Sequence, residues 1–326
     1  MKALVYDDVE KLVYRYMADP VPAAGQSLIR IEASGICGSD MHAYLGHDER
    51  RPAPVILGHE AAGTVEGGAL DGKRVTINPL TTCGLCKACK AGRDNLCPDR
   101  MIISMPPREG AFGELVVMAD RNLVEVPDGV PLVKAALAEP LACGWHAVRL
   151  GAETLDMPIA QARCVVIGGG AIGVGAALCL RAFGATDIHV IEPNAVRRAS
   201  LDAIDGFTAV APGAVTAADL VIDGVGYATT RADATAITRP GGVIMHIGLG
   251  ESTGGLDIRR MTLQEITFIG TYTYTAQDFR DTAAAIFDGR LGALDWTEER
   301  PLSEGGQAFA DIRAGIVAAP KIILRP

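Results

Sequence analysis

The sequence predicts an α/β protein made of a β-rich domain and a domain with a doubly wound parallel sheet. Between residues 164 and 272, strand-like apolar runs alternate with glycines and helix-like segments, as they do in parallel sheets. Residues 1–145 are rich in glycine, proline and β-forming residues but lack this alternation. A chain of 326 residues is long enough to form two domains, each with its own core.

We expect the β-rich domain to use both ends of the chain. It takes residues 1–145 and 273–326, and the parallel-sheet domain takes residues 146–272. In the returning tail, "AQDFRDTAAAIFDGRL" has the apolar spacing of a helix, and "KIILRP" is typical of a last strand.

Charge and hydropathy exclude several classes of function. The formal net charge is -9 and no long Lys/Arg cluster occurs, so nucleic acid is not an expected partner. No stretch approaches the ~20 uncharged apolar residues that a membrane span needs, and the N-terminus carries acids where a signal peptide has its apolar segment. These features favour a cytoplasmic protein, in which thiols stay reduced.

Four of the eight cysteines lie within "TTCGLCKACKAGRDNLCPD", spaced C-x2-C-x2-C-x7-C. Such short steps let one turn of chain wrap around a zinc ion, so in a reducing compartment the cluster favours a metal site over disulfides. Four thiolates leave no open coordination position, which predicts a structural zinc that holds a lobe of about residues 81–99 in shape. The expected ligands are Cys83, Cys86, Cys89 and Cys97.

A second set of metal ligands lies in "GICGSDMHAY" at residues 35–44 and "ILGHEAAG" at residues 56–63. Cys37, His59 and Glu60 offer a thiolate, an imidazole and a carboxylate, which is the mixed set of a catalytic zinc with an open position. Taken alone, the cysteine could be a small buried apolar residue, and the His-Glu pair could be an ordinary hydrogen-bonded pair.

A glycine fingerprint lies in "CVVIGGGAIGVGAALCLRAFGATDIHVIEPN", where G-x-G-x-x-G follows a strand-like run and opens a helix. A second apolar run ends at Glu192, about 20 residues further on, and this context predicts a dinucleotide-binding unit with the pyrophosphate on the helix N-terminus. Glu192 would accept hydrogen bonds from the ribose hydroxyls and repel a 2'-phosphate, which favours NAD over NADP. Arg197 and Arg198 lie close enough to weaken that preference.

Further cofactor contacts are expected at the carboxyl ends of later strands, because ligands of doubly wound sheets bind there. The later glycines fit ordinary turns equally well. The expected contact residues are Gly168, Gly170, Ala171, Ile172, Gly173, Glu192, Arg197, Gly224, Gly248 and Leu249.

Five motifs occur in the order seen in the zinc-dependent medium-chain dehydrogenase/reductase family: "GICGSDMH", "GHEAAG", the four-cysteine cluster, "AEPLACG" and "VVIGGGAIG". The resemblance covers essentially the whole chain. It is closest to the branch of the polyol (sorbitol, xylitol, galactitol, idonate) and threonine dehydrogenases. It implies a GroES-like fold for the β-rich domain, a Rossmann fold for the other, and a homodimer or homotetramer.

The resemblance also implies residue roles. The mixed cluster of Cys37, His59 and Glu60 would hold the catalytic zinc, and Glu139 of the Glu-Pro-Leu motif would bind that zinc or its water. Ser39 would hydrogen-bond the substrate hydroxyl, and His42 would pass the proton to solvent. From spacing alone, the serine could instead cap a helix, and the histidine could be an ordinary surface residue.

The expected function is transfer of a hydride between NAD and a secondary alcohol, most closely a polyol or sugar acid, in an enzyme with two zinc ions per chain. The alternatives are a threonine 3-dehydrogenase-like or general alcohol dehydrogenase, and an inactive nucleotide-binding regulator. Tyr44, Met105, Phe112 and Tyr274 are candidates for lining the substrate pocket.

Overall fold

The computed structural model describes all residues from Met1 to Pro326 and divides into two compact units. Unit 1 comprises Met1–Glu139, Thr275–Asp288 and Leu294–Pro326, and unit 2 comprises Pro140–Tyr274 and Gly289–Ala293. The sequence-based boundary at residue 145 falls inside helix α4 (Ala138–Thr154), a few residues beyond the division seen here. No helix in the structure has both the length and the apolar character that a membrane span requires.

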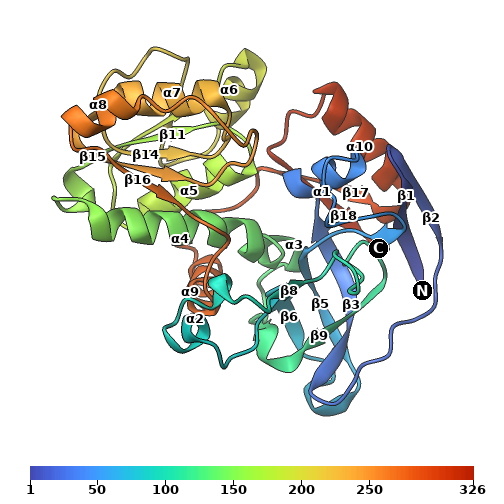
Figure 1. Cartoon of the computed structure of the whole chain (residues 1–326). Helices are drawn as coiled ribbons and strands as arrows, with labels where there is room; N and C mark the ends of the chain where they lie inside the picture. Colours follow the sequence, from blue (N-terminus) through green and yellow to red (C-terminus); the bar gives the residue numbers. More distant parts are fainter. The chain divides into compact units, whose positions relative to one another are not determined.

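Unit 1 is built mainly from antiparallel strands, in agreement with the predicted β-rich domain (Figure 1). Its largest sheet has seven strands. Six of them follow the order β10-β6-β5-β3-β18-β17, and the seventh, β9, pairs with the first half of β3, whereas β18 pairs with its end. The strands are β1 (Lys2–Asp8), β2 (Lys11–Tyr16), β3 (Gln26–Gly35), β4 (Val55–Ile56), β5 (Glu60–Glu66), β6 (Arg74–Ile77), β7 (Leu80–Thr81), β8 (Met101–Ile102), β9 (Leu115–Ala119), β10 (Leu123–Glu125), β17 (Thr297–Pro301) and β18 (Lys321–Arg325). The helices are α1 (Gly38–Tyr44), α2 (Lys87–Lys90), α3 (Leu132–Ala135), α9 (Ala276–Phe287) and α10 (Gly305–Ala314).

The last strand, β18, lies inside this sheet. It pairs antiparallel with β3, where Leu324 faces Ser34, and parallel with β17. Its residues Ile322–Leu324 are almost fully buried, as expected for a strand covered on both faces. The tail predictions of a helix and a final strand are confirmed by α9 and β18.

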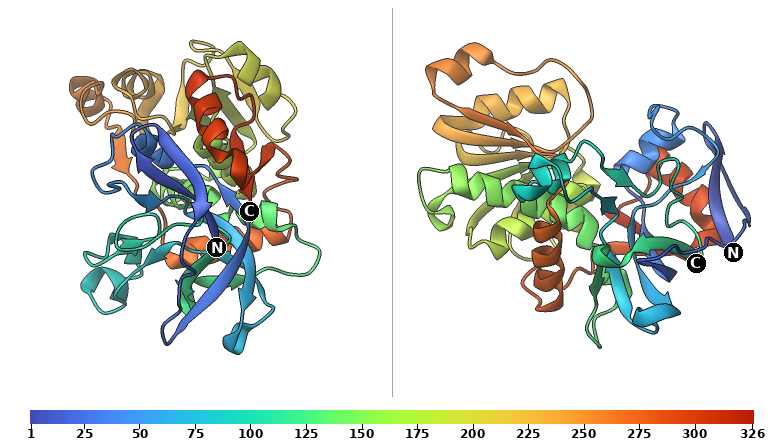
Figure 2. Two further views of the ribbon diagram at one scale, coloured as in Figure 1. Left: turned by 90° about the vertical axis from the view of Figure 1, so that its right-hand side faces the viewer. Right: turned by 60° about the horizontal axis from the view of Figure 1, so that its bottom comes forward.

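Unit 2 holds a six-stranded sheet in the order β13-β12-β11-β14-β15-β16, and every neighbouring pair is parallel. Helices lie on both faces of the sheet (Figures 1 and 2). Because such crossovers are right-handed, α5 and α6, which lead toward β13, lie on one face, and α7 and α8, which lead toward β16, lie on the other. This is the predicted doubly wound arrangement, with a strand order that reverses next to β11. The elements are β11 (Arg163–Ile167), β12 (Asp187–Ile191), β13 (Thr208–Val210), β14 (Ala218–Asp223), β15 (Thr238–His246), β16 (Thr267–Gly270), α5 (Ala171–Ala182), α6 (Ala195–Leu201), α7 (Ala228–Ile237) and α8 (Ile258–Leu263).

Small residues let the helices of unit 2 pack closely. A Cβ at Gly144 of α4 would lie 2.8 Å from the backbone nitrogen of Ala176 in α5, so a larger side chain there would push the helices apart. The middle residues of the central strands are apolar, and the neighbours Val165 and Val166, which point to opposite faces, are both fully buried. This burial on both faces explains the continuous apolar runs in the sequence.

Candidate functional site

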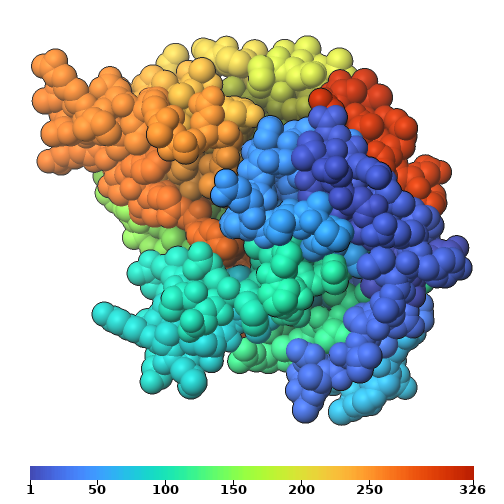
Figure 3. Space-filling model, turned by 45° about the vertical axis from the view of Figure 1, so that its right-hand side comes forward, coloured from blue at the N-terminus to red at the C-terminus, as the bar shows by residue number.

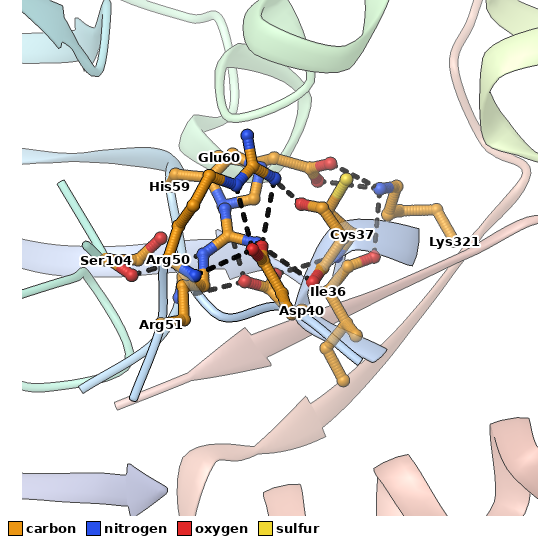
Figure 4. A network of polar contacts seen from close by, with 12 residues as sticks. Ile36, Cys37, Asp40, Arg50, Arg51, His59, Glu60, Ser104 and Lys321 are labelled. Carbon is orange, nitrogen blue, oxygen red and sulfur yellow. Dashed lines mark hydrogen bonds and ion pairs between the residues drawn. The ribbon is translucent and has the colours of Figure 1, made fainter. Parts of the chain in front are cut away.

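The register of two neighbouring strands brings the mixed cluster together. Strand β3 ends at Gly35, opposite Glu60 at the start of the antiparallel strand β5. Cys37 follows β3 and precedes helix α1, while His59 directly precedes β5. Residues more than twenty positions apart therefore meet at one end of a strand pair, as the close-up in Figure 4 shows.

The ligand atoms of Cys37, His59 and Glu60 all lie within 4.8 Å of one another. His59 is 4% exposed, Glu60 is fully buried, and Cys37 is half-buried. A thiol, an imidazole and a carboxylate that converge in a buried place form a donor set that suits zinc, with three protein ligands and room for one more. The residues therefore fit the metal that the motifs implied.

Asp40 fixes the orientation of the histidine ring. Its Oδ1 lies 3.4 Å from His59 Nδ1, an ion-pair distance at which the angles fall short of a hydrogen bond. Its carboxylate also accepts the backbone N–H groups of Cys37 (3.0 Å) and Gly58 (3.4 Å). Burial lowers the pKa of His59, but the charge of Asp40 outweighs burial and holds that pKa well above its usual value. With Nδ1 turned toward Asp40, Nε2 is left for a ligand.

Arg51 anchors helix α1 from outside the cluster. The guanidinium is 2% exposed, and it donates to the carbonyl oxygens of Ser39 (2.9 Å) and Ser104 (3.2 Å). It also contacts Asp48 at 3.1 Å. These bonds tie the first turn of α1 to two loops, so the helix that carries Ser39 is held against the cluster.

Lys321 of strand β18 contacts the third member of the cluster. Its Nζ lies 2.6 and 2.7 Å from the two carboxylate oxygens of Glu60 and 2.9 Å from the carbonyl oxygen of Ile36. The lysine is 4% exposed. A buried charge of each sign is therefore paired beside the candidate metal ligands.

The three remaining residues of the expected catalytic set lie at different distances from the cluster. Ser39 Oγ is 3.5 Å from His59 Nε2, so the serine hydroxyl faces the ligand nitrogen. Glu139 is 5% exposed in the first turn of α4 and lies outside the group of three. His42 is solvent-exposed on α1, and its ring packs edge-on to His47.

The four clustered cysteines also come together. Their sulfur atoms lie within 4.8 Å of one another, and all eight cysteines of the chain are free thiols. Backbone N–H groups of Leu85 and Cys86 point at the sulfur of Cys83, each at 3.4 Å, and lower the pKa of its thiol to about 7. N–H groups directed at sulfur stabilise the thiolate, which is the form of cysteine that binds zinc.

The lobe has almost no core of its own. Between residues 83 and 97, only Asn95 and Cys97 are buried, and the lobe stands out from the surface in the space-filling view (Figure 3). It is held at one side by Asp94, which accepts the backbone N–H of Ala276 at the start of α9. Such a segment needs a metal to order it, in keeping with a closed structural site.

The fingerprint glycines lie at the carboxyl edge of the parallel sheet. Gly168 has a φ of 103°, a value that glycine adopts readily, and a Cβ at Gly173 would lie 1.8 Å from the carbonyl oxygen of Gly168. Gly170 precedes helix α5, where a Cβ would meet no atom within 4 Å and no side chain caps the helix. Free N–H groups beside open space fit a pyrophosphate.

Glu192 ends strand β12 and is only 3% exposed. Its carboxylate accepts the backbone N–H groups of Gly169 (3.0 Å) and Asn194 (2.9 Å), and Arg197 lies 3.2 Å away. The acid that sequence analysis assigned to the ribose thus touches the glycine loop, and an arginine stands beside it.

The later cofactor candidates follow strands β14 and β15. A Cβ at Gly224 would lie 3.3 Å from the backbone nitrogen of Gly173, and one at Gly248 would lie 2.1 Å from the carbonyl carbon of Val225. Both glycines therefore allow close approach of loops at the carboxyl edge. Leu249 is 74% exposed at the same loop. Ala171 and Ile172 form the first turn of α5.

Several residues of the site could not be predicted from the sequence, and two predicted pocket residues lie elsewhere. Lys321 and Arg51 gave no signal, because nothing in their local sequence shows what they touch. Two suggested pocket residues were wrong: Tyr44 and Phe112 are buried in the core of unit 1, where both rings pack on Phe309.

Comparison with known proteins places both parts of the chain. Residues 23–128 match the family described as alcohol dehydrogenase GroES-like domain, and residues 171–288 match the zinc-binding dehydrogenase family. The chain is 30% identical over 311 residues to a 2-dehydro-3-deoxy-L-galactonate 5-dehydrogenase of Pseudoalteromonas atlantica, covering 89% of each chain. It is 29% identical over 318 residues to a probable D-xylulose reductase A of Neosartorya fischeri, covering 88% of this chain and 86% of the other.

A solved structure gives the same result. A putative zinc-binding dehydrogenase of Sinorhizobium meliloti, bound to NADP, is 28% identical, with a TM-score of 0.89 over 100% of this chain and 99% of the other. These matches confirm the resemblance seen in the motifs. The chain therefore belongs to the zinc-dependent medium-chain dehydrogenase family, whose members are oxidoreductases that act on CH-OH groups with zinc and a nicotinamide cofactor.

Proposed function

We propose that this protein oxidises a secondary hydroxyl group of a polyol or sugar acid to the ketone, and catalyses the reverse reaction, with NAD as its preferred cofactor. The convergence of Cys37, His59 and Glu60 within 4.8 Å carries the proposal, because these donors suit a catalytic zinc with an open position. The relatives named for D-xylulose and for a deoxygalactonate support the substrate class.

The mixed cluster would hold the catalytic zinc through Cys37 Sγ, His59 Nε2 and a Glu60 oxygen. When bound, zinc supplies a Lewis acid that lowers the pKa of a substrate hydroxyl, and NAD accepts the hydride. The chain itself orients this site: Asp40 aligns the imidazole, and the buried surroundings exclude water.

Two residues of helix α1 would handle the substrate proton. Ser39 is placed to accept it, because its hydroxyl lies 3.5 Å from the ligand nitrogen of His59. His42 is exposed on the same helix and would deliver the proton to solvent. Glu139, buried in unit 1 at the start of α4, would serve as a further ligand or as a hydrogen-bond acceptor at the open position.

In unit 2, the helix N-terminus behind Gly170 would bind the pyrophosphate of the cofactor. Glu192 would accept the ribose hydroxyls, and its negative charge would repel a 2'-phosphate, which supports NAD as the preferred cofactor. Arg197 contacts that same carboxylate at 3.2 Å, and this pairing limits the preference. The four-cysteine lobe would hold a second, structural zinc.

We also infer that the protein is a homo-oligomer of the reducing cytoplasm. Strand β16 is the last strand of its sheet, so one of its edges is free to pair with a second copy. Eight free thiols support a reducing compartment.

The proposal is tested by the initial rate of NAD reduction with the zinc-loaded protein. The panel of substrates holds sugar alcohols, aldonates, simple secondary alcohols and L-threonine, and is repeated with NADP. Oxidation of a sugar alcohol or aldonate of one hydroxyl stereochemistry, faster with NAD, is expected. Activity with threonine or simple alcohols alone would contradict the proposed substrate class. Absence of activity with every substrate, in a protein that binds two zinc ions and NAD, would contradict the proposal that it is an enzyme.

A further inference from the structure

Lys321 is a buried, charged residue beside the candidate metal ligands. Lys321 is 4% exposed, and lysine is rarely buried to that degree without a partner, because removing its charge from water is costly. Its three ammonium protons have three acceptors within 2.9 Å: both oxygens of Glu60 and the carbonyl oxygen of Ile36. The ammonium group is thus fully satisfied and held in one position.

The surroundings of Lys321 are strongly negative. Besides Glu60, which it contacts, the ammonium group interacts electrostatically with Cys37 and Glu139. All three are members of the candidate catalytic set. The ammonium group therefore stands among the groups that would face the metal, and it contacts one of them directly.

The backbone makes room for the carboxylate on its other side. Gly35 lies opposite Glu60 in the β3–β5 register, and a Cβ at Gly35 would lie 2.1 Å from Glu60 Oε2. The carboxylate therefore sits between an ammonium group and a bare glycine backbone. Each carboxylate oxygen carries two lone pairs, so the contact with Lys321 leaves one on each oxygen for a metal ion.

We propose that Lys321 is a positioning residue: its ammonium group holds the Glu60 carboxylate in the orientation in which it binds the metal. This inference rests on the proposed function, because it takes Cys37, His59 and Glu60 as the ligands. A carboxylate that a hydrogen bond already holds in place binds a metal ion without a further loss of side-chain conformational entropy. It also makes the last strand, β18, part of the metal site, although no ligand lies on it.

The test is a zinc titration of the metal-free protein in competition with a chromogenic chelator, which resolves two sites by their affinities. Lys321→Met is expected to weaken the catalytic site by roughly 10- to 100-fold, as removal of partners behind metal ligands commonly does. The four-cysteine site keeps its affinity. Cobalt substitution gives a second readout, because a displaced carboxylate alters the visible bands of cobalt in the mixed site.

Three matched variants separate positioning from general stability. Lys321→Arg keeps a charged donor and recovers most of the affinity. Gly35→Ala leaves the lysine in place but pushes the carboxylate away, so it reproduces the loss and carries the test if Lys321→Met fails to fold. Lys134→Met removes a lysine whose ion pair with Asp295, at 2.8 Å, is partly exposed, and both zinc sites remain unchanged.

Wild-type zinc affinity together with an unchanged cobalt spectrum in Lys321→Met would overturn the proposal, and so would tighter binding, which would mean that the lysine restrains the carboxylate from the metal. These readouts do not depend on catalysis. If wild-type protein oxidises no alcohol but Lys321→Met weakens one zinc site, the inference stands and the proposed function fails.

Discussion

Two glycines of the same fingerprint should respond to alanine in opposite ways. At Gly173 a Cβ would lie 1.8 Å from the carbonyl oxygen of Gly168, far inside contact distance, and that oxygen belongs to the backbone. At Gly170 a Cβ would meet no atom within 4 Å. Gly173 therefore allows helix α5 to pack closely against the preceding loop, whereas Gly170 leaves space for a ligand.

The expected magnitudes follow from this geometry. Gly173→Ala forces helix α5 away from the loop before it, and overpacking of this kind costs about 1–3 kcal/mol of the free energy of unfolding. That corresponds to a fall in Tm of roughly 2–4 °C for each kcal/mol in a domain of 150–250 residues. Gly170→Ala leaves the free energy of unfolding within about 1 kcal/mol of the wild type, because only the preference for glycine over alanine at a helix N-cap is lost.

The assay combines urea denaturation with a fluorescence titration of NADH. Gly173→Ala should unfold at lower urea, whereas Gly170→Ala should unfold normally and bind NADH more weakly. If Gly173→Ala is as stable as the wild type, the packing argument is wrong. If Gly170→Ala binds NADH normally, the pyrophosphate is not bound at this helix N-terminus.

Three further predictions concern other parts of the chain. Cys97→Ser should lose one of two zinc ions and leave the lobe open to protease, as measured by metal analysis and limited proteolysis. Glu192→Ser should improve kcat/KM for NADP relative to NAD by roughly 10- to 100-fold, since Arg197 loses a charged partner and can bind a 2'-phosphate. Burial raises the pKa of Asp223, but the His246 ring, 3.3 Å from the carboxylate, and hydrogen bonds from two backbone N–H groups outweigh burial and lower that pKa. Its contribution to stability is therefore present above about pH 4 and is lost as pH falls through its folded pKa, so unfolding curves of the wild type and Asp223→Asn should converge in acid.

Sequence analysis predicted the architecture because the signals were local. The glycine fingerprint, the alternation of strands and helices, and the cysteine spacing each lie within a few turns of chain. The four-cysteine metal site at residues 83–97 could be predicted from its spacing alone, without knowing which distant residues it contacts.

The surroundings of the ligands could not be predicted in the same way. Lys321 reaches Glu60 because a strand formed by the last residues of the chain pairs with β3, a contact between positions 261 residues apart. Arg51 is buried because two distant loops supply carbonyl oxygens. Aromatic residues near the ligand motifs suggested a pocket, but Phe112 packs in the core beneath Gly58, at a position set by the strand register. Tertiary pairing decided each of these outcomes.

The central claim is that the thiol, imidazole and carboxylate at Cys37, His59 and Glu60 hold a zinc that catalysis requires. The most direct measurement is the zinc content and the rate of NAD reduction of Cys37→Ala, beside Cys143→Ala as a control outside both clusters. We predict two zinc ions and full activity in the wild type and the control, and one zinc ion, a native circular dichroism spectrum and no measurable rate in Cys37→Ala. Full activity or two bound zinc ions in Cys37→Ala would contradict the account.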